Sequence, residues 1–102
     1  MPYIVFCQDS DKAPDLRTQY KQAHFTYIED NLHKICVAGP MYDPATQQFQ
    51  GSCFIYHTDD LAEAEELLFE DPYYTCGIYR QCDFSRFVAA AGTWIGGTVW
   101  QK

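Results

Sequence analysis

The order of strand-like and helix-like segments is the strongest constraint on the fold of this chain. Short runs rich in aromatic and β-branched residues predict strands, and apolar residues repeated every three or four positions predict helices. The predicted strands cover residues 3–8, 35–38, 49–57 and 77–84, and the predicted helices cover residues 15–34 and 61–70. In chain order these elements give β-α-β-β-α-β, the split βαβ or ferredoxin-like arrangement. We therefore expect an α+β domain with an antiparallel four-stranded sheet.

Turn and cap residues place the boundaries of these elements. Pro14 fits the first turn of the first helix, where its missing N–H costs nothing. Gly39-Pro40 ends the second predicted strand, and residues 43–48 form a polar hairpin loop. Asp71-Pro72 ends the second helix, because proline disfavours a helical conformation in the residue before it.

The predicted strands are apolar on both faces. Two helices cover only one face of a four-stranded sheet, and an antiparallel sheet with a solvated face shows alternating apolar and polar residues. Residues 53–56 read Cys-Phe-Ile-Tyr and do not alternate. Because a large apolar patch rarely stays wet, we predict a homodimer whose sheets pack face to face. The alternative is that the C-terminal tail folds over this face, but so short a tail does not cover a whole sheet.

Length and charge limit the number of domains and the classes of partner. The chain has 102 residues, 47% of them hydrophobic, and fits one domain at residues 1–87 with a C-terminal Gly/Trp tail at residues 88–102. The formal net charge of −7 disfavours nucleic acid as a partner, since an acidic surface repels phosphates. No apolar run approaches the roughly 20 residues that span a bilayer, and the first residues lack the basic start of a secretory signal. We expect no nucleic-acid partner and no membrane.

The five cysteines predict reduced thiols. Five is an odd number, and no pair has the C-x-x-C spacing of many zinc sites. Most of the cysteines fall inside predicted strands among apolar neighbours, which is typical of buried free thiols. We therefore expect a cytoplasmic protein without a zinc site or a disulfide framework.

His24 is the histidine best placed for proton transfer. A histidine side chain, with an ordinary pKa of about 6.5, suits acid–base chemistry near neutral pH. His33 falls opposite the apolar stripe of the first helix, and His57 ends a strand. His24 falls inside the stripe, beside Tyr20 and Tyr27. A half-buried histidine needs a polar partner, and periodicity alone favours a core histidine bonded to a backbone carbonyl.

Arg17 and Lys21 share a flank of the first helix with His24, because the three residues have i, i+4, i+7 spacing. In so acidic a chain, a cationic cluster beside a histidine fits an anionic substrate such as a carboxylate. The alternative is a pair of surface cations bonded to nearby carboxylates.

Asp71 is a second candidate, because it follows the second predicted helix directly. The macrodipole is negative at a helix C-terminus, so a carboxylate there needs compensation, which a histidine or a cation across the fold would supply. The alternative is a turn-forming Asp-Pro pair.

In their order and spacing, several short segments resemble the YciI-like (YCII-related) family over residues 2–87. The matching segments are Tyr3-Ile4-Val5, Arg17 to His24-Phe25-Thr26-Tyr27, Ala38-Gly39-Pro40, Gly51, Ala62 with Ala64, Asp71-Pro72-Tyr73, Gly77-Ile78-Tyr79 and Phe84 to Phe87. The Gly/Trp tail lies beyond the core of the family.

The resemblance implies a ferredoxin-like fold that dimerises as an α+β barrel. The active site proposed for the family pairs a helix-one histidine with the aspartate of an Asp-Pro motif, and these positions are His24 and Asp71 here. One branch is associated with dehydrochlorination of chlorinated hydroquinones. The usual pattern often has an arginine before the histidine. Lys21 stands there in this chain, which keeps the charge but loses the bidentate fork.

With the resemblance, a catalytic His24–Asp71 dyad is favoured over a core histidine. We expect His24 to act as general base or acid on a conjugated or phenolic acid, with Asp71 orienting it, and without a metal or cofactor. The reaction would be of the lyase, isomerase or dehydrohalogenase type. The expected substrate-binding residues are Arg17, Tyr20, Lys21, Tyr27 and Tyr73.

Two other functions stay open from the sequence. The domain could be a non-catalytic metabolite-binding or dimerisation module, in which the dyad only holds the helices in place. It could also be a cofactor-free oxygenase of the same barrel type.

Overall fold

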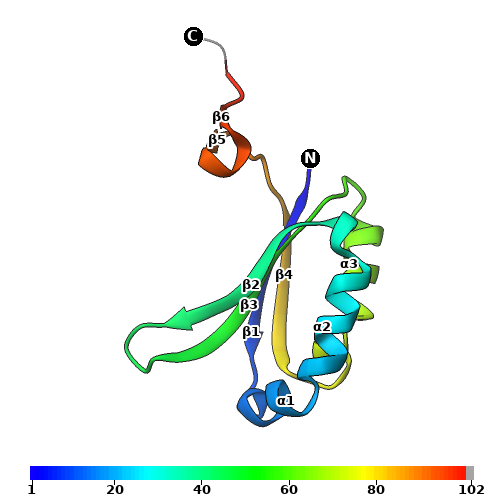
Figure 1. Cartoon of the computed structure of the whole chain (residues 1–102), viewed down its shortest axis with the longest axis vertical. Helices are drawn as coiled ribbons and strands as arrows, with labels where there is room; N and C mark the ends of the chain where they lie inside the picture. Colours follow the sequence, from blue (N-terminus) through cyan, green and yellow to red (C-terminus); the bar gives the residue numbers. More distant parts are fainter. Residues whose placement is uncertain (101–102) are drawn as a thin grey trace.

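The computed structural model describes residues 1–100, in which helices cover a four-stranded sheet (Figure 1). Its elements are, in chain order, β1 (Tyr3–Asp9), α1 (Ala13–Gln19), α2 (Lys21–Asp30), the 3₁₀ helix η1 (Leu32–Lys34), β2 (Ile35–Asp43), β3 (Gln48–Tyr56), α3 (Leu61–Phe69), α4 (Pro72–Thr75), β4 (Tyr79–Arg86), β5 (Ala91–Gly92), the 3₁₀ helix η2 (Thr93–Ile95) and β6 (Gly97–Thr98). No helix in the described part of the chain is long and apolar enough to cross a membrane.

The main sheet is antiparallel and has the strand order β2-β3-β1-β4. Val5 lies opposite Phe54 on one side and Phe84 on the other, so β1 is a central strand. The helices lie on one face of this sheet and leave the other face uncovered (Figure 1). The expected α+β, ferredoxin-like fold is confirmed.

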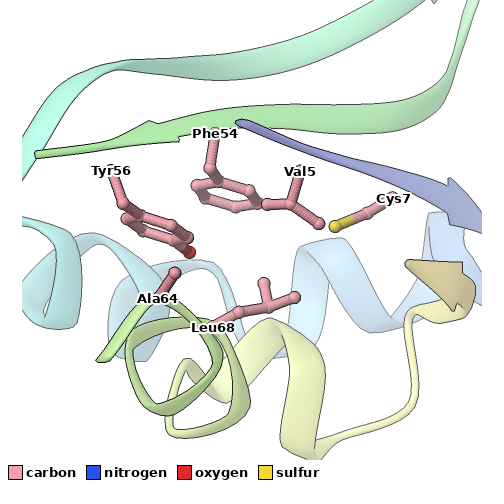
Figure 2. Packing of buried hydrophobic residues seen from close by; sticks show 6 residues of the cluster. All are labelled: Val5, Cys7, Phe54, Tyr56, Ala64 and Leu68. Carbon is pink, nitrogen blue, oxygen red and sulfur yellow. The ribbon is translucent and has the colours of Figure 1, made fainter. Parts of the chain in front are cut away.

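Six buried side chains form the main core between the sheet and α3 (Figure 2). They alternate along the strands, because successive side chains of a strand point to opposite faces. The cluster consists of Val5 and Cys7 from β1, Phe54 and Tyr56 from β3, and Ala64 and Leu68 from α3. The rings of Phe54 and Tyr56 stack with centroids 5.6 Å apart. This packing sets the distance between α3 and the sheet.

The prediction that Gly39-Pro40 ends the second strand is wrong. β2 runs through both residues to Asp43, and Pro40 pairs in register with Ser52. β2 is an edge strand, and an edge strand tolerates proline, because the N–H that proline lacks would face outward. The long hairpin of β2 and β3 therefore extends beyond the helices (Figure 1).

The first helix is also divided, where a single helix was expected. α1 and α2 meet at Tyr20, whose φ and ψ of −104° and 11° leave the helical range, although the N–H of His24 still bonds the Tyr20 carbonyl at 3.0 Å. Tyr20 packs against a second small core of Ala13, Tyr73 and Ile78. Neither proline nor glycine marks this break, so nothing in the local sequence predicts it.

Asp71 begins a helix rather than only following one. α3 ends at Phe69, and Asp71 is the N-cap of α4, where its side chain accepts a hydrogen bond from the Tyr73 N–H at 2.9 Å. Aspartate is a favoured N-cap residue. The expected conflict with the dipole of the preceding helix is therefore offset by the next helix.

The uncovered face of the sheet carries apolar side chains. Ile4 and Phe6 alternate with the buried Val5 and Cys7, so they point away from the helices, and Phe6 is 47% exposed. Their partners in register on β3, Ile55 and Cys53, share this face. We call it the outer face.

The C-terminal arm, residues 88–100, projects past the end of the sheet (Figure 1). β5 and β6 pair only with each other, through Ala91 with Thr98 and Gly92 with Gly97. Trp94 is 85% exposed. Residues 101–102, the last of the predicted tail, lie outside the described residues.

Gly51→Ala is expected to destabilise the fold. A Cβ at this position would lie 2.2 Å from the Cys7 carbonyl oxygen and 2.9 Å from Met41 Cε, so the paired strands would have to move apart. We expect a loss of about 1–3 kcal/mol in the free energy of unfolding, measured by urea denaturation. Gly39→Ala is the control, since no atom lies within 4 Å of its added Cβ. Equal stability of the two variants would contradict the close approach at Gly51.

Candidate active site

His24 and Asp71 form a direct contact between α2 and the start of α4. His24 Nδ1 lies 2.7 Å from Asp71 Oδ1, with 13% of the His24 side chain and none of the Asp71 side chain exposed. The same Oδ1 accepts the Tyr73 N–H at 2.9 Å. Local capping and the long-range contact thus hold the carboxylate in one orientation.

The contact leaves the other ring nitrogen of His24 available. An ionised carboxylate only accepts hydrogen bonds, so Nδ1 carries the hydrogen and Nε2 has a free lone pair in neutral His24. Asp71 Oδ2 is buried and makes no hydrogen bond to any residue from 1 to 100. This arrangement matches the histidine–carboxylate pairs in which the carboxylate sets the tautomer.

Tyr73 fixes the plane of the imidazole. Its ring stacks on His24 with centroids 3.8 Å apart and an angle of 4° between the planes. The Tyr73 hydroxyl donates to the Arg17 carbonyl at 3.0 Å. Burial raises the pKa of Tyr73, so this hydroxyl keeps its proton and remains a donor at neutral pH.

Arg17 is held in place by protein groups. Its Nε and Nη2 donate to the two carboxylate oxygens of Asp9 at 3.1 and 2.9 Å. Nη2 also donates to the Gly51 carbonyl and to Ser52 Oγ, and the guanidinium carbon lies 5.3 Å from the Phe49 ring centroid. The charge of Arg17 is therefore balanced by Asp9. Lys21, by contrast, is exposed and has no ion-pair partner within residues 1–100.

A groove of about 1160 Å³ runs between the α1–α2 helices and the β2–β3 hairpin. Its lining combines apolar and aromatic side chains with a few polar groups, which is typical of small-molecule sites. The lining residues include Phe25, Ile28, Pro40, Phe49, Phe54 and Tyr73, together with Arg17, Lys21, His24 and Ser52. A smaller hollow of about 410 Å³ beside β4 contains none of the predicted site residues.

Two of the predicted pocket residues lie away from this groove. The Tyr27 hydroxyl donates to the Leu67 carbonyl at 2.7 Å, and burial together with the nearby Glu70 raises its pKa to about 12. Tyr20 packs against the small core beside Tyr73. Both tyrosines thus contact the interior side of the helices, Tyr27 through Leu67 of α3 and Tyr20 through Tyr73 of α4. Of the five predicted substrate-binding residues, Arg17, Lys21 and Tyr73 line the groove, and Tyr20 and Tyr27 do not.

Sequence reasoning missed Asp9 and Ser52. Asp9 lies just after the first predicted strand, residues 3–8, and the structure extends β1 to it across a register shift between Gln8 and Asp9. Ser52 sits between Gly51 and Cys53 in a strand that seemed apolar throughout. Strand alternation with Phe54 was the one available signal that it faces the helices.

The described residues contain no group of three or more histidine, cysteine or acidic side chains arranged to hold a metal ion. His33 and His57 are exposed, and neither lines the groove. The ionisable side chains that line the groove are His24, Arg17, Lys21, Asp9, Tyr42 and Tyr73, with Asp71 buried behind His24.

Solved structures share this fold. The chain is similar to the 5-chloro-2-hydroxyhydroquinone dehydrochlorinase TftG from Burkholderia phenoliruptrix AC1100, determined in complex with 2,5-dihydroxybenzoquinone. The TM-score is 0.78 at 23% identity, over 91% of this chain and 97% of TftG. A protein from Chloroflexus aurantiacus J-10-fl, described as a candidate antibiotic biosynthesis monooxygenase, matches with a TM-score of 0.51 at 12% identity, over 90% of this chain and 98% of the other.

Sequence comparison identifies a family for this chain but no individual relative. No curated protein matches this chain at a significant level. The model of the YCII-related domain matches residues 1–88, which include β1 to β4 and every predicted site residue. The resemblance read from the short segments is thereby confirmed, and the chain belongs to the YCII-related domain family.

Proposed function

We propose that this protein is an acid–base enzyme acting on a small conjugated or phenolic molecule, with His24 as the base. The observation that carries the proposal is the 2.7 Å contact between His24 Nδ1 and the buried Asp71, which leaves Nε2 free on a side chain that lines the groove. A positioned base of this kind contributes about 10²–10⁴-fold to a rate.

The proposed reaction begins with proton transfer to His24 Nε2. The proton comes from a hydroxyl group or from a carbon beside a carbonyl, and Asp71 stabilises the imidazolium that forms. In an isomerisation the proton returns to another atom of the same molecule. In a dehydrochlorination, chloride leaves with the electron pair of the C–Cl bond, so HCl is lost in total and no oxidant is needed. The fold shared with TftG, a dehydrochlorinase, supports this second type.

Charge at the groove favours an anionic substrate. Asp9 balances Arg17, so Lys21 is the cation with no carboxylate partner among residues 1–100 that lines the groove. Its ammonium group would attract a phenolate or carboxylate into a chain whose net charge is −7. Tyr73, Phe25 and Phe49 supply aromatic surface for a conjugated ring.

A structural role for the dyad is the second candidate. A buried ion pair that joins α2 to α4 would have the same geometry in a protein that only binds a metabolite. The cofactor-free oxygenase rests on the fold shared with the Chloroflexus protein alone, and no contact in the groove favours it.

We also propose that the protein forms a homodimer through the outer face. Ile4, Phe6 and Ile55 form an apolar surface that the helices do not cover. All five cysteines are free, which supports the expected cytoplasmic location.

His24→Ala is expected to reduce turnover by about 10²–10⁴-fold, because the proton acceptor is removed. Chloride release from a chlorinated hydroxyhydroquinone, followed with the quinone absorbance, measures it. His33→Ala, a change at an exposed histidine outside the groove, is the control and should leave turnover unchanged. A loss of only a fewfold in His24→Ala would eliminate His24 as the base.

Asp71→Asn tests whether the dyad is catalytic or structural. The amide oxygen can still accept from Tyr73 N–H, so the cap of α4 survives, while the charge that stabilises the imidazolium is lost. We expect turnover to fall by roughly 10²-fold or more with little change in melting temperature. Asp59→Asn, in the exposed loop before α3, is the matched control. A lower melting temperature with undiminished turnover would favour the structural role.

Phe6→Arg is expected to convert the dimer into a monomer, because a charge would be buried in the outer face. Light scattering coupled to size-exclusion chromatography gives the mass. Leu32→Arg, at an exposed apolar residue in η1, should keep the dimer mass. A wild-type protein that elutes as a monomer would contradict the proposed interface.

A further inference from the structure

Ser52 is a buried hydroxyl group on the floor of the groove. It lies in β3, its residue is 4% exposed, and it is one of the groove's lining residues. Two donors converge on its oxygen: Arg17 Nη2 at 3.1 Å and the Tyr79 hydroxyl at 3.0 Å. Both donors are held by the fold, since Arg17 is paired with Asp9 and Tyr79 is in β4.

The hydrogen of the Ser52 hydroxyl has no acceptor among residues 1–100. A serine hydroxyl has one hydrogen to donate and two lone pairs that accept. Arg17 Nη2, whose two hydrogens are shared among Asp9 Oδ1, the Gly51 carbonyl and Ser52 Oγ, and the Tyr79 hydroxyl occupy both lone pairs, and no residue from 1 to 100 accepts a hydrogen bond from Ser52. A buried donor without an acceptor is costly, so such donors normally find a partner in water or in a ligand.

We propose that the Ser52 hydroxyl is a donor to the substrate, which binds the phenolate, enolate or quinone carbonyl oxygen of an aromatic diol or its oxidised form. The class of ligand in this proposal is taken from the function proposed above, on which the proposal therefore rests. It adds the electrophilic end of the site, which stabilises negative charge on oxygen as an oxyanion hole does.

Arg17 strengthens this donor position. Its Nη1 makes no hydrogen bond to any residue from 1 to 100, and its guanidinium carbon lies 5.3 Å from the ring centroid of Phe49 and 5.6 Å from that of Tyr73. The two rings and the Asp9 carboxylate restrict the guanidinium, so its Nη2 stays next to Ser52. Because hydrogen bonds in a chain polarise one another, the bond from the guanidinium makes the Ser52 hydroxyl a stronger donor to a bound oxygen.

Tyr73 connects the two ends of the site. One ring contacts His24 at 3.8 Å between centroids and also lies beside Arg17. A substrate ring within the groove can thus face His24 with an acidic hydrogen and Ser52 with an oxygen acceptor. Simultaneous contact with a base and a donor is what enolisation and elimination beside a carbonyl require.

The competing arrangement reverses one hydrogen bond. If Ser52 donates to Tyr79, the Tyr79 hydrogen is the one left without an acceptor, and Tyr79 does not line the groove. Burial raises the pKa of Tyr79, so its hydroxyl keeps the hydrogen. The two arrangements predict opposite effects of Tyr79→Phe on ligand binding, which makes them separable.

The experiment measures binding and ionisation of 4-nitrocatechol, whose visible spectrum changes when a phenol group ionises. Ser52→Ala alone would strand the Tyr79 hydroxyl, so the comparison is between Tyr79→Phe and the double variant Ser52→Ala/Tyr79→Phe. We expect the double variant to bind the anion about tenfold more weakly than Tyr79→Phe, and to ionise the bound phenol at a pH about one unit higher. Tyr79→Phe alone should weaken binding by less than about threefold, because Arg17 still orients Ser52.

Three results would overturn the proposal. They are equal affinity of the double variant and Tyr79→Phe, tighter binding by Tyr79→Phe than by the wild type, and no saturable binding by the wild type. The base proposed above fails separately. A His24→Ala variant with full turnover would remove His24 from the mechanism and would leave the effect of Ser52 on the bound phenol unchanged.

Discussion

The buried carboxylate of Asp71 is the constraint on which the arrangement of the helices depends. A carboxylate withdrawn from water is strongly destabilising unless donors surround it. Here the donors come from two elements, the His24 ring on α2 and the Tyr73 N–H at the start of α4. Both donors reach Oδ1, and leaving a buried acceptor without one of its donors typically costs about 1–3 kcal/mol. The position of α2 against α4 is therefore coupled to the chemical state of the dyad.

Arg17 pairs with a carboxylate of the protein, although its charge and position suggest that it binds a substrate anion. Its sequence position beside Lys21 and His24 favours an anion anchor. In the structure Asp9 pairs with the guanidinium in a bidentate contact, and Phe49 and Tyr73 lie beside it. The arginine thus frames the floor of the groove and orients Ser52, while Lys21 supplies the uncompensated charge at the rim.

The order of the elements could be predicted from the sequence, because period-two and period-3.6 patterns are local. The boundaries that failed depend on tertiary context. Pro40 reads as a strand end until β2 is known to be an edge strand. Tyr20 carries no signal for a break, since its deviation depends on packing against Ala13 and Ile78. The conformations of Pro40 and Tyr20 can therefore be explained only once the full topology is known.

The site shows the same division. His24 and Asp71 could be singled out as candidates because each residue belongs to a short motif, and the motifs recur in the order of the family. Ser52 was not found, since its importance depends on donors from α1 and β4 that are distant in the sequence. Tyr27 does not line the groove, since the apolar stripe of a helix contains residues that face the core as well as residues that border a groove.

The C-terminal arm has a consequence for optical measurements. The chain has two tryptophans, Trp94 and Trp100, and both belong to the arm, with 85% and 54% exposure. The cores of the domain contain tyrosine, phenylalanine and aliphatic side chains instead. Tryptophan emission from this protein therefore reports the surroundings of the arm and is nearly silent on unfolding of the sheet, which tyrosine absorbance or circular dichroism follows.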